Sequence, residues 1–368
     1  MNVDDFDFDL PGALIAQDPP AERGGSRLLV LHRSGGNEHT MFTNLVDYLV
    51  PGDLLVLNNT RVLPARLLGR RVPSGGALEC LLLAQIPNIK SQVPSSNSNP
   101  ESRTPDPDRA EWDALVHPGQ KLKPGAQMAF ERDDVRIDGE VVSMHFQGRR
   151  TIRLWTNHAG GLADAIDRVG HIPLPPYIKR DDSASDKDRY QTVYARERGS
   201  VAAPTAGLHF TAGQLDALAA RGIERAEVTL HVGYGTFKPV NVDRVDDHVV
   251  DPERFTVGPE AAAALTRARH ERRRIIAVGT TTVRTLESLA IDANGALTPA
   301  SGETSLFIRP GHRFQLVDAM VTNFHLPKSS LLMLVSALAG RERVLAAYCE
   351  AVDDGYRFYS YGDAMLIL

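Results

Sequence analysis

The sequence contains few of the features that would assign it to several large protein classes. Among 368 residues only Cys80 and Cys349 are cysteines, too few and too far apart for a disulfide framework or a cysteine metal site. No run of 18 or more apolar residues occurs, so we predict no membrane-spanning helix and no membrane partner. The first residues, MNVDDFDFDLPG, are acidic and have neither the basic nor the apolar region of a signal peptide. We therefore expect a cytoplasmic protein.

Several nucleotide-binding and metal-binding motifs are also absent. No Gly-x-Gly-x-x-Gly follows a strand-like run and no Walker loop occurs, which argues against a Rossmann dinucleotide site and a P-loop. The 12 histidines include no His-Glu-x-x-His pair, so we expect neither a metal nor a true cofactor. The net charge of −5 excludes general coating of nucleic acid but not a local basic face.

Two kinds of sequence texture indicate the domain organisation. Helix-like and strand-like runs alternate in residues 1–60 and 157–368, as in a mixed α/β protein. Residues 61–156 hold only short strand-like runs between Gly, Pro and charged turns. We predict a barrel-like α/β catalytic body interrupted by an inserted all-β domain of Greek-key or barrel type. Residues 86–109 are rich in Pro, Ser and Asn, which predicts a mobile loop inside that insert.

The strongest candidate site is the run of small and hydroxyl residues that precedes His209. Ser200 to Gly207 (SVAAPTAG) includes Thr205, and Thr211 then begins an amphipathic helix. Small residues let a ligand approach the backbone, and a helix start offers free N–H groups. A histidine there can exchange a proton near neutral pH. A tight turn and a structural histidine remain the alternative interpretation.

A second candidate site is residues 275–288, IIAVGTTTVRTLES. A buried strand ends at Gly279, and the next three residues are threonines that begin a helix carrying Arg284 and Glu287. Hydroxyls, N–H groups and an arginine converge there, as at an anion site. An ordinary helix start with an exposed Arg–Glu pair would give the same pattern. The three threonines are Thr280, Thr281 and Thr282.

Two further segments carry candidate binding residues. In residues 229–240 an aromatic lies between two glycines after His231, which permits close approach of a flat ring, although a plain β-bulge is the alternative. Residues 58–71 contain several arginines that would face phosphates, or simply solvent. The candidates in these segments are Gly233, Tyr234, Thr236, Asn58, Thr60, Arg61, Arg66, Arg70 and Arg71.

The C-terminal part supplies the last candidates. Asn323, His325 and Lys328 precede a helix that Ser329 or Ser330 would cap, and His325 beside Pro327 is also compatible with a turn. Tyr361 and Asp363 lie near the end of the chain, where Asp363 is equally compatible with a simple turn.

Taken together, these segments resemble the S-adenosylmethionine:tRNA ribosyltransferase-isomerase family of queuosine biosynthesis. Nine stretches match from end to end in the expected order, which makes the resemblance far more specific than any one motif. They are residues 6–29, 51–67, 117–125, 170–180, 189–211, 229–240, 278–288, 304–340 and 356–368.

The resemblance implies an enzyme that transfers and isomerises the ribosyl group of S-adenosylmethionine. The acceptor would be 7-aminomethyl-7-deazaguanine (preQ1) at the tRNA wobble position, and the products epoxyqueuosine in tRNA, adenine and methionine. S-adenosylmethionine would be a consumed co-substrate, and we expect a monomer. An S-adenosylmethionine-dependent RNA methyltransferase and a non-catalytic RNA-binding module are the alternatives.

We assign roles to the candidates on this basis. His209 is our first choice for proton transfer, His231 and His325 are second choices, and Glu287 completes the catalytic group. The remaining candidates would bind substrate, with Tyr234 or Phe210 stacking on a purine. Those binding candidates are Asn58, Thr60, Arg61, Thr205, Gly207, Gly233, Tyr234, Thr236, Thr280, Thr281, Thr282, Arg284, Asn323, Lys328, Tyr361 and Asp363.

The chain departs from the family pattern at two places. The stretch 86–109 is longer and more polar than the family leads us to expect. After His248 the family continues with Met-His-x-Glu, whereas this chain has Val249-Val250-Asp251-Pro252-Glu253. A second histidine therefore has no counterpart there, although Glu253 keeps the acidic position.

Overall fold

The structure, a computed structural model, describes residues 1–86 and 106–368 and divides into two compact units. The unit that we call the body comprises Met1–Arg61, Pro175–Asp181 and Asp188–Leu368. The unit that we call the barrel domain comprises Val62–Leu174 and Asp182–Lys187. The mobile loop predicted at 86–109 lies almost wholly outside the described residues.

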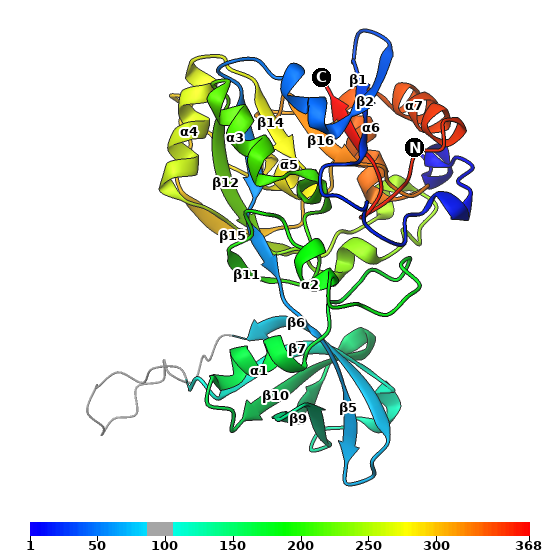
Figure 1. Ribbon diagram of the computed structural model, residues 1–368, viewed down its shortest axis with the longest axis vertical. Coiled ribbons are helices and arrows are strands. Elements are labelled where there is room, and N and C mark those ends of the chain that lie inside the picture. The colour runs from blue at the N-terminus through cyan, green and yellow to red at the C-terminus, as the bar shows by residue number, and fades with distance from the viewer. Residues whose placement is uncertain (87–105) are drawn as a thin grey trace. The chain divides into compact units, whose positions relative to one another are not determined.

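The body contains most of the helices (Figure 1). Its strands are β1 (Arg27–Leu31), β2 (Asn37–Met41), β3 (Leu54–Asn58), β11 (Glu197–Ser200), β12 (Glu224–Leu230), β13 (Glu253–Val257), β14 (Ile275–Val278), β15 (Ala300–Thr304), β16 (Ala319–Asn323) and β17 (Ala364–Ile367). Its α-helices are α3 (Ala212–Ala220), α4 (Pro259–His270), α5 (Thr280–Glu287), α6 (Ser330–Ala339) and α7 (Arg341–Asp353). Its 3-10 helices are η1 (Val3–Phe6), η2 (Gly12–Leu14), η3 (Phe42–Asp47), η7 (Thr205–His209), η8 (Tyr234–Phe237) and η9 (Val245–Asp247). Strand β4 (Thr60–Val62) and helix α2 (Asp186–Arg189) each cross a boundary between the units.

A nine-stranded mixed sheet organises the body. Its strand order is β15-β13-β12-β3-β14-β16-β17-β1-β2. The four neighbours β12, β3, β14 and β16 run parallel, whereas β17 runs antiparallel to β16. The carboxyl ends of four central strands therefore meet at one edge of the sheet, where ligands bind in open α/β proteins.

Both faces of the central strands of this sheet are buried, which explains their nearly continuous apolar runs. Alternate residues point to opposite faces. Leu29 and Val56 belong to a core that includes apolar residues of α4, α5, α6 and α7. Leu28 and Leu55 belong to the opposite core, which includes residues of η3 and α3. The sheet is thus held between two layers, and only its edges are left for a site.

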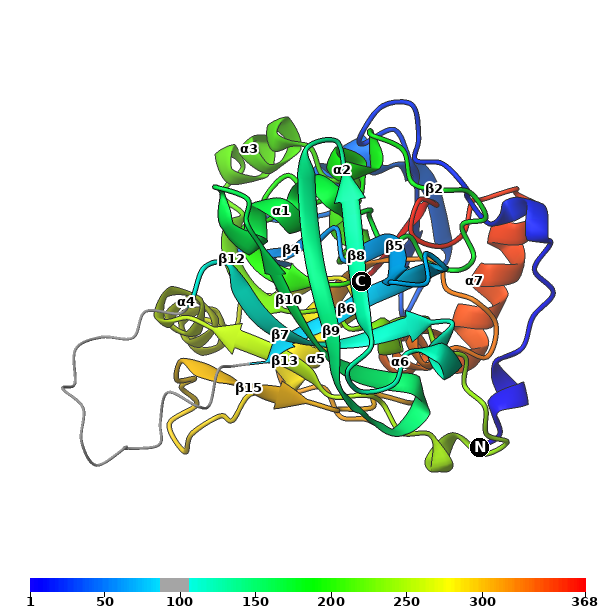
Figure 2. The same ribbon diagram turned by 90° about the horizontal axis from the view of Figure 1, so that it is seen from below.

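The barrel domain is a closed antiparallel barrel of six strands in the order β10-β7-β6-β5-β8-β9. Figure 2 shows its strands β8 and β9 side by side. The strands are β5 (Arg66–Val72), β6 (Ala77–Ile86), β7 (Arg109–His117), β8 (Gln127–Arg132), β9 (Val135–Met144) and β10 (Arg149–Thr156). Helix α1 (Gly161–Val169) and the 3-10 helices η5 (Gly119–Lys121) and η6 (Phe146–Gly148) complete it.

The barrel domain extends beyond the range 61–156 expected from the sequence. Leu162, Ile166 and Val169 of α1 pack into the same apolar core as the barrel strands. An amphipathic helix belongs to the unit that buries its apolar face, so α1 falls in this unit and not in the body. The predicted fold class, a mixed α/β body with an inserted all-β domain, is confirmed. None of the helices within residues 1–86 and 106–368 has the length and apolar character that a membrane crossing requires.

Candidate functional site

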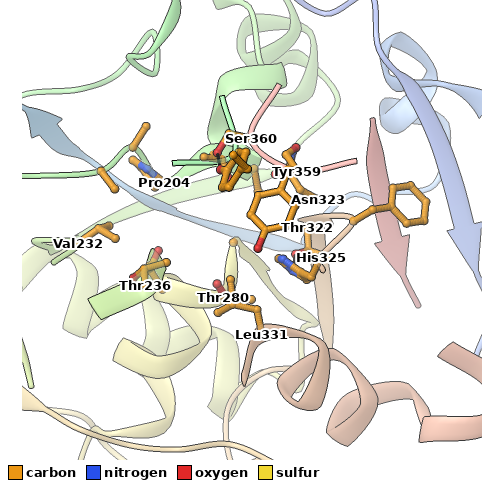
Figure 3. Close-up of a pocket in the computed structure, with 18 residues that line it drawn as sticks. Pro204, Val232, Thr236, Thr280, Thr322, Asn323, His325, Leu331, Tyr359 and Ser360 are labelled. Atoms are coloured by element: carbon orange, nitrogen blue, oxygen red, sulfur yellow. Dashed lines mark hydrogen bonds between the residues drawn. The ribbon is translucent and has the colours of Figure 1, made fainter. Parts of the chain in front are cut away.

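A cavity lies at the carboxyl edge of the central strands of the body (Figure 3). It encloses about 570 Å³ of space between atoms, part of it open to solvent. Segments following β12, β14 and β16 line it, together with η7 and the residues before β17. The lining residues are Tyr177, Ala202, Ala203, Pro204, Thr205, Ala206, Val232, Thr236, Gly279, Thr280, Thr281, Thr322, Asn323, Phe324, His325, Leu331, Tyr359 and Ser360.

Helix α5 begins at the wall of this cavity. Gly279 adopts φ +88°, a left-handed conformation that glycine accepts without strain, and this turns the chain from β14 into the helix. Gly279, Thr280 and Thr281 line the cavity, and none of the described side chains caps the helix. The N–H groups of the first turn and the helix dipole therefore favour a negatively charged group at this wall.

Asn58, at the end of β3, fixes the start of α5. Its Nδ2 donates to Leu230 O (3.0 Å) and to Thr281 Oγ1 (3.3 Å). Its Oδ1 accepts from Thr60 N (3.2 Å) and Leu230 N (3.0 Å). All four hydrogen-bonding positions of this amide are thus used by the protein. Asn58, predicted to bind substrate, holds Thr281 in place instead.

Arg284 and Glu253 form an ion pair buried beneath the loop after β12. Glu253 Oε1 also accepts from Gly233 N (2.9 Å) and Thr236 Oγ1 (3.3 Å). The Glu253 carboxylate therefore stabilises the loop that places Thr236 at the cavity. The sequence spacing, one helical turn, had suggested a pair between Arg284 and Glu287. That pair does not form, because the Arg284 guanidinium reaches Glu253 and the Thr304 carbonyl instead.

His325 is the predicted histidine that lines the cavity. Its Nε2 lies 3.0 Å from Thr322 Oγ1, and its backbone N–H donates to Tyr348 OH. Burial lowers the pKa of His325 to about 3, so the ring is neutral at pH 7. When Nε2–H donates to Thr322, Nδ1 carries a lone pair that no described residue uses. This nitrogen can accept a hydrogen bond or a proton from a ligand. A pKa of about 3 makes it a weaker base than an ordinary imidazole, so proton transfer to it requires a ligand that stabilises the charged ring.

His209, the first choice for proton transfer, lies one layer behind the cavity. It is 4% exposed, and its ring contacts Phe42 at 5.1 Å between centroids. Its Nδ1 lies 2.8 Å from Ser26 Oγ and its Nε2 lies 3.1 Å from Asn323 Nδ2. Burial lowers its pKa to about 3. Both nitrogens already have protein partners, so the geometry favours a structural role over direct contact with substrate.

His231, the other second choice, also lies outside the group of lining residues. Its Nδ1 is 2.9 Å from Thr60 Oγ1, and burial lowers its pKa. The next residue, Val232, lines the cavity in its place. Because side chains alternate along extended backbone, His231 and Val232 cannot both face the same space.

Comparisons with known proteins agree with this architecture over the whole chain. Residues 3–367 match the queuosine biosynthesis protein family. The chain belongs to this family. Proteins named S-adenosylmethionine:tRNA ribosyltransferase-isomerase from Symbiobacterium thermophilum and Heliobacterium modesticaldum are 51% and 49% identical over 369 residues, covering 100% of each chain. The crystal structure of S-adenosylmethionine tRNA ribosyltransferase from Thermotoga maritima is 36% identical, with a TM-score of 0.52 and coverage of 99% of this chain and 100% of that one.

Of the predicted site residues, the structure brings seven to the cavity of this family member. Six of the seven line it, namely Thr205, Thr236, Thr280, Thr281, Asn323 and His325. The seventh, Gly207, is not a lining residue and packs against Tyr194 and Thr192. A Cβ on Gly207 would lie 2.2 Å from Tyr194 OH and 2.7 Å from Thr192 Cγ2. The absence of a side chain at Gly207 is therefore a packing requirement and not a ligand contact.

Glu287, predicted to be catalytic, stabilises a loop of the protein. Its carboxylate accepts from the backbone N–H groups of Gln315 (2.8 Å), Leu316 (3.1 Å) and Val317 (3.0 Å). His312 Nε2 lies 3.4 Å from Oε2 as a fourth partner, so protein groups surround the whole carboxylate. Glu287 is not among the lining residues of the cavity.

Asp363 and Lys328 also have structural partners. Asp363 accepts from the backbone N–H groups of Arg27 and Arg357, both at 2.8 Å. Lys328 pairs with Asp4 and Asp7, which raise its pKa.

The other predicted residues lie away from the cavity lining. Thr282 Oγ1 donates to the carbonyl of Val278, the last residue of β14, and Phe210 is fully buried against Phe42. Arg61 is exposed, whereas Arg66 pairs with Glu79 in the barrel domain. Also outside the lining are Gly233, Tyr234 and Tyr361.

Sequence reasoning missed an aromatic wall of the cavity. Tyr177 and Tyr359 line it with ring centroids 3.8 Å apart. Tyr359 adopts φ +75°, a conformation that bulky residues rarely accept and that concentrates at functional sites. The tyrosines of residues 356–361 stand out in the sequence, but choosing Tyr359 over Tyr361 requires the backbone conformation.

No group of three or more His, Cys, Asp or Glu side chains suited to a metal ion occurs in the part of the chain that the structure describes.

Proposed function

We propose that this protein transfers and isomerises the ribosyl group of S-adenosylmethionine onto 7-aminomethyl-7-deazaguanine at the tRNA wobble position. The products are epoxyqueuosine in tRNA, adenine and methionine. The observation that carries the proposal is the 51% identity over the full length to a relative named for this activity. S-adenosylmethionine is a co-substrate, and the reaction uses no metal or resident cofactor.

The body cavity suits a nucleoside that carries an amino-acid chain. The open start of α5, with Thr280 and Thr281, offers donors to a carboxylate. The ring pair Tyr177–Tyr359 offers an apolar surface to a purine. We assign the methionine carboxylate to the former and the adenine to the latter, in place of the stacking residues expected from the sequence.

The chemistry requires a neutral base close to the sulfonium. The positive sulfur acidifies the C5′ hydrogens, so removal of one proton begins the rearrangement. His325 is our choice for this step, because its ring lines the cavity and is neutral at pH 7. The amine of the acceptor base must also be neutral in order to attack.

The tRNA contributes its target base at low energetic cost. The wobble position lies in a single-stranded loop, so its base is turned outward more easily than a base in a duplex. Exposed arginines such as Arg61 and Arg70 would contact flanking phosphates, which makes binding weaken with salt. We further propose that the protein acts in the cytoplasm as a monomer, a state that light scattering in solution tests.

Product analysis tests the proposed function. The protein is incubated with S-adenosylmethionine and tRNA that carries the aminomethyl-deazaguanine. We expect free adenine and methionine in equal amounts, and the mass of epoxyqueuosine in the digested tRNA. S-adenosylhomocysteine as the product would instead identify a methyltransferase, and the absence of adenine would overturn the proposal.

His325→Gln tests the assignment of the base. Glutamine can occupy the site and form hydrogen bonds but cannot exchange a proton, so kcat should fall by about 10²–10⁴-fold. His270→Gln is the matched control, because His270 lies at the exposed end of α4 and contacts the Asn294 carbonyl, away from the cavity. A His325→Gln enzyme with near wild-type kcat would exclude His325 as the base.

A further inference from the structure

Asn323 stands between the cavity and His209. It is the last residue of β16, lines the cavity and is 2% exposed. Its Nδ2 lies 3.0 Å from the Tyr359 carbonyl oxygen and 3.1 Å from His209 Nε2. Figure 3 shows Asn323 beside Tyr359 and Ser360 at the cavity.

The partners of this amide fix its orientation and the tautomer of His209. The Tyr359 carbonyl can only accept a hydrogen bond, so the NH₂ group of Asn323 and not its oxygen must face it. The same NH₂ group then donates its second hydrogen to His209 Nε2, which must carry a lone pair. His209 is therefore neutral, with its proton on Nδ1 and donated to Ser26 Oγ at 2.8 Å.

The amide oxygen of Asn323 is left without a partner. Asn323 Oδ1 is buried and has no hydrogen bond within the described part of the protein. A buried acceptor without a donor is costly, and native proteins rarely keep one without a reason. Rotating the amide would not remove the cost, because the oxygen would then face the Tyr359 carbonyl. A ligand donor in the adjacent cavity is the partner that the protein lacks.

We propose that Asn323 is a specificity-determining residue whose Oδ1 accepts a hydrogen bond from an N–H or O–H group of the bound nucleoside. His209 is the positioning residue that holds the amide in this orientation, through Ser26 on its far side. The identity of the nucleoside as S-adenosylmethionine rests on the proposed function; the geometry of the acceptor does not.

The donor is one of the few that such a ligand carries. S-adenosylmethionine offers the 6-amino group of adenine, two ribose hydroxyls and the α-ammonium group. Each is removed in one analogue: the 6-oxo purine, the 2′-deoxy and 3′-deoxy nucleosides, and the compound lacking the α-amino group. Binding of these probes to wild type and Asn323→Leu by calorimetry forms a set of double-mutant cycles.

For one of the four analogues, the losses of binding free energy caused by Asn323→Leu and by removal of the ligand's donor group should not be additive. Asn323→Leu should weaken binding of S-adenosylmethionine by about 10-fold, as expected for one hydrogen bond to a buried acceptor. The analogue lacking the bonded donor should bind wild type about 10-fold more weakly and should lose nothing further in the variant. If, for each of the four analogues, the loss of affinity relative to S-adenosylmethionine is the same in wild type and in Asn323→Leu, the proposal is wrong.

The role of His209 is tested by two substitutions with different hydrogen-bonding capacity. In His209→Gln, Oε1 can accept from Asn323, but the side chain cannot exchange a proton. In His209→Leu the acceptor is lost. We expect KM for S-adenosylmethionine to rise about 10-fold in His209→Leu and to stay within about 3-fold of wild type in His209→Gln. The acidic limb of the kcat/KM profile should be unchanged in His209→Gln.

The opposite pattern would make His209 the base. A His209→Gln enzyme as slow as His209→Leu, with kcat reduced 100-fold or more and the acidic limb lost, overturns the positioning role. If His209→Leu does not fold, Ser26→Ala tests the same chain of hydrogen bonds from its outer end. It should raise KM about 3-fold at constant kcat, and an unchanged KM contradicts the proposal.

Failure of the proposed function is recognised separately. A wild-type protein that binds S-adenosylmethionine but releases no adenine would overturn the reaction and leave the binding cycles on Asn323 interpretable. A wild-type protein that releases adenine, with Asn323→Leu binding every analogue as wild type does, would overturn only the inference about Asn323.

Discussion

The barrel domain and the body use their charged residues in different ways. In the barrel domain, Arg153 lies opposite Glu111 on neighbouring strands, with the side chains 28% and 38% exposed. In the body, Arg284 and Glu253 are 8% and 4% exposed and also bind the backbone and hydroxyl groups around them. Pairs of the first kind are screened by water, whereas the second kind is stable only while both partners remain.

This difference shows which interactions fix the positions of side chains in each unit. The barrel derives its shape from alternating apolar residues and a closed set of strands, and its surface charges are replaceable. In the body, buried polar groups lie where strands end and fix residues that line the cavity. Asn58 fixes Thr281, and the Arg284–Glu253 pair fixes Thr236. We therefore expect substitutions at the buried polar groups around the cavity of the body to be costly, and substitutions at the exposed ion pairs of the barrel domain to be tolerated. Arg150 of the barrel is an exception, because it is buried and donates to three backbone carbonyls.

The largest expected effect is the loss of the buried arginine. Arg284→Met leaves the Glu253 carboxylate buried without its partner, which should reduce the free energy of unfolding by about 3–5 kcal/mol. Arg136→Met in the barrel domain is the matched change, because Arg136 is 54% exposed in its pair with Glu131, and it should cost less than about 1 kcal/mol. Urea unfolding measures both. Equal losses would contradict the distinction between the two units.

The second prediction concerns pH and the two buried histidines. His209 and His325 have pKa values of about 3 in the folded protein, against about 6.5 in an unfolded chain. Below pH 6.5 the unfolded chain therefore binds protons that the folded chain does not, and stability falls as pH falls. Each histidine should remove about 2 kcal/mol between pH 7 and pH 5. Across this range the free energy of unfolding of His209→Gln should fall less steeply with decreasing pH than that of wild type, by about 1 kcal/mol per pH unit on average.

A glycine at the back of the site provides a test of packing. A Cβ on Gly207 would lie 2.2 Å from the fully buried Tyr194 OH, so Gly207→Ala should cost about 1–3 kcal/mol. Gly213, at the first turn of α3, has no atom within 4 Å of such a Cβ, and Gly213→Ala should be neutral or slightly stabilising. Thermal unfolding compares the two, and a Gly207→Ala protein as stable as wild type would mean that Tyr194 moves freely.

The smallest expected effect is the coupling between surface charges of the barrel. A double-mutant cycle on Arg153 and Glu111, each changed to Ala, should give a coupling energy of about 0.2–1 kcal/mol. It should decrease when NaCl is raised from 0.05 to about 1 M, because exposed charges are screened. A coupling energy above about 2 kcal/mol would show that exposed ion pairs of the barrel stabilise its structure as strongly as buried ones.

The sequence alone predicted the two fold types and much of the cavity wall. Apolar runs such as residues 54–57 and 275–278 predict strands because both of their faces are apolar. Gly279 and the threonines after it indicated a helix start with free donors, and the structure brings Thr280 and Thr281 to the cavity. These features are set by residues close together in the sequence, which is why apolar periodicity and helix-capping patterns predict them.

Only the tertiary structure decided which polar residue faces the cavity and which supports it. His209 and Asn323 are 114 positions apart, and Asn323 meets Tyr359 because β16 and β17 pair with Asn323 opposite Ala364. That register puts His325 at the cavity and His209 behind an amide, although the sequence pattern favoured His209 over His325. A one-residue change in register would reverse the facing of each side chain, so hydrogen-bond partners this distant cannot be read from the local pattern.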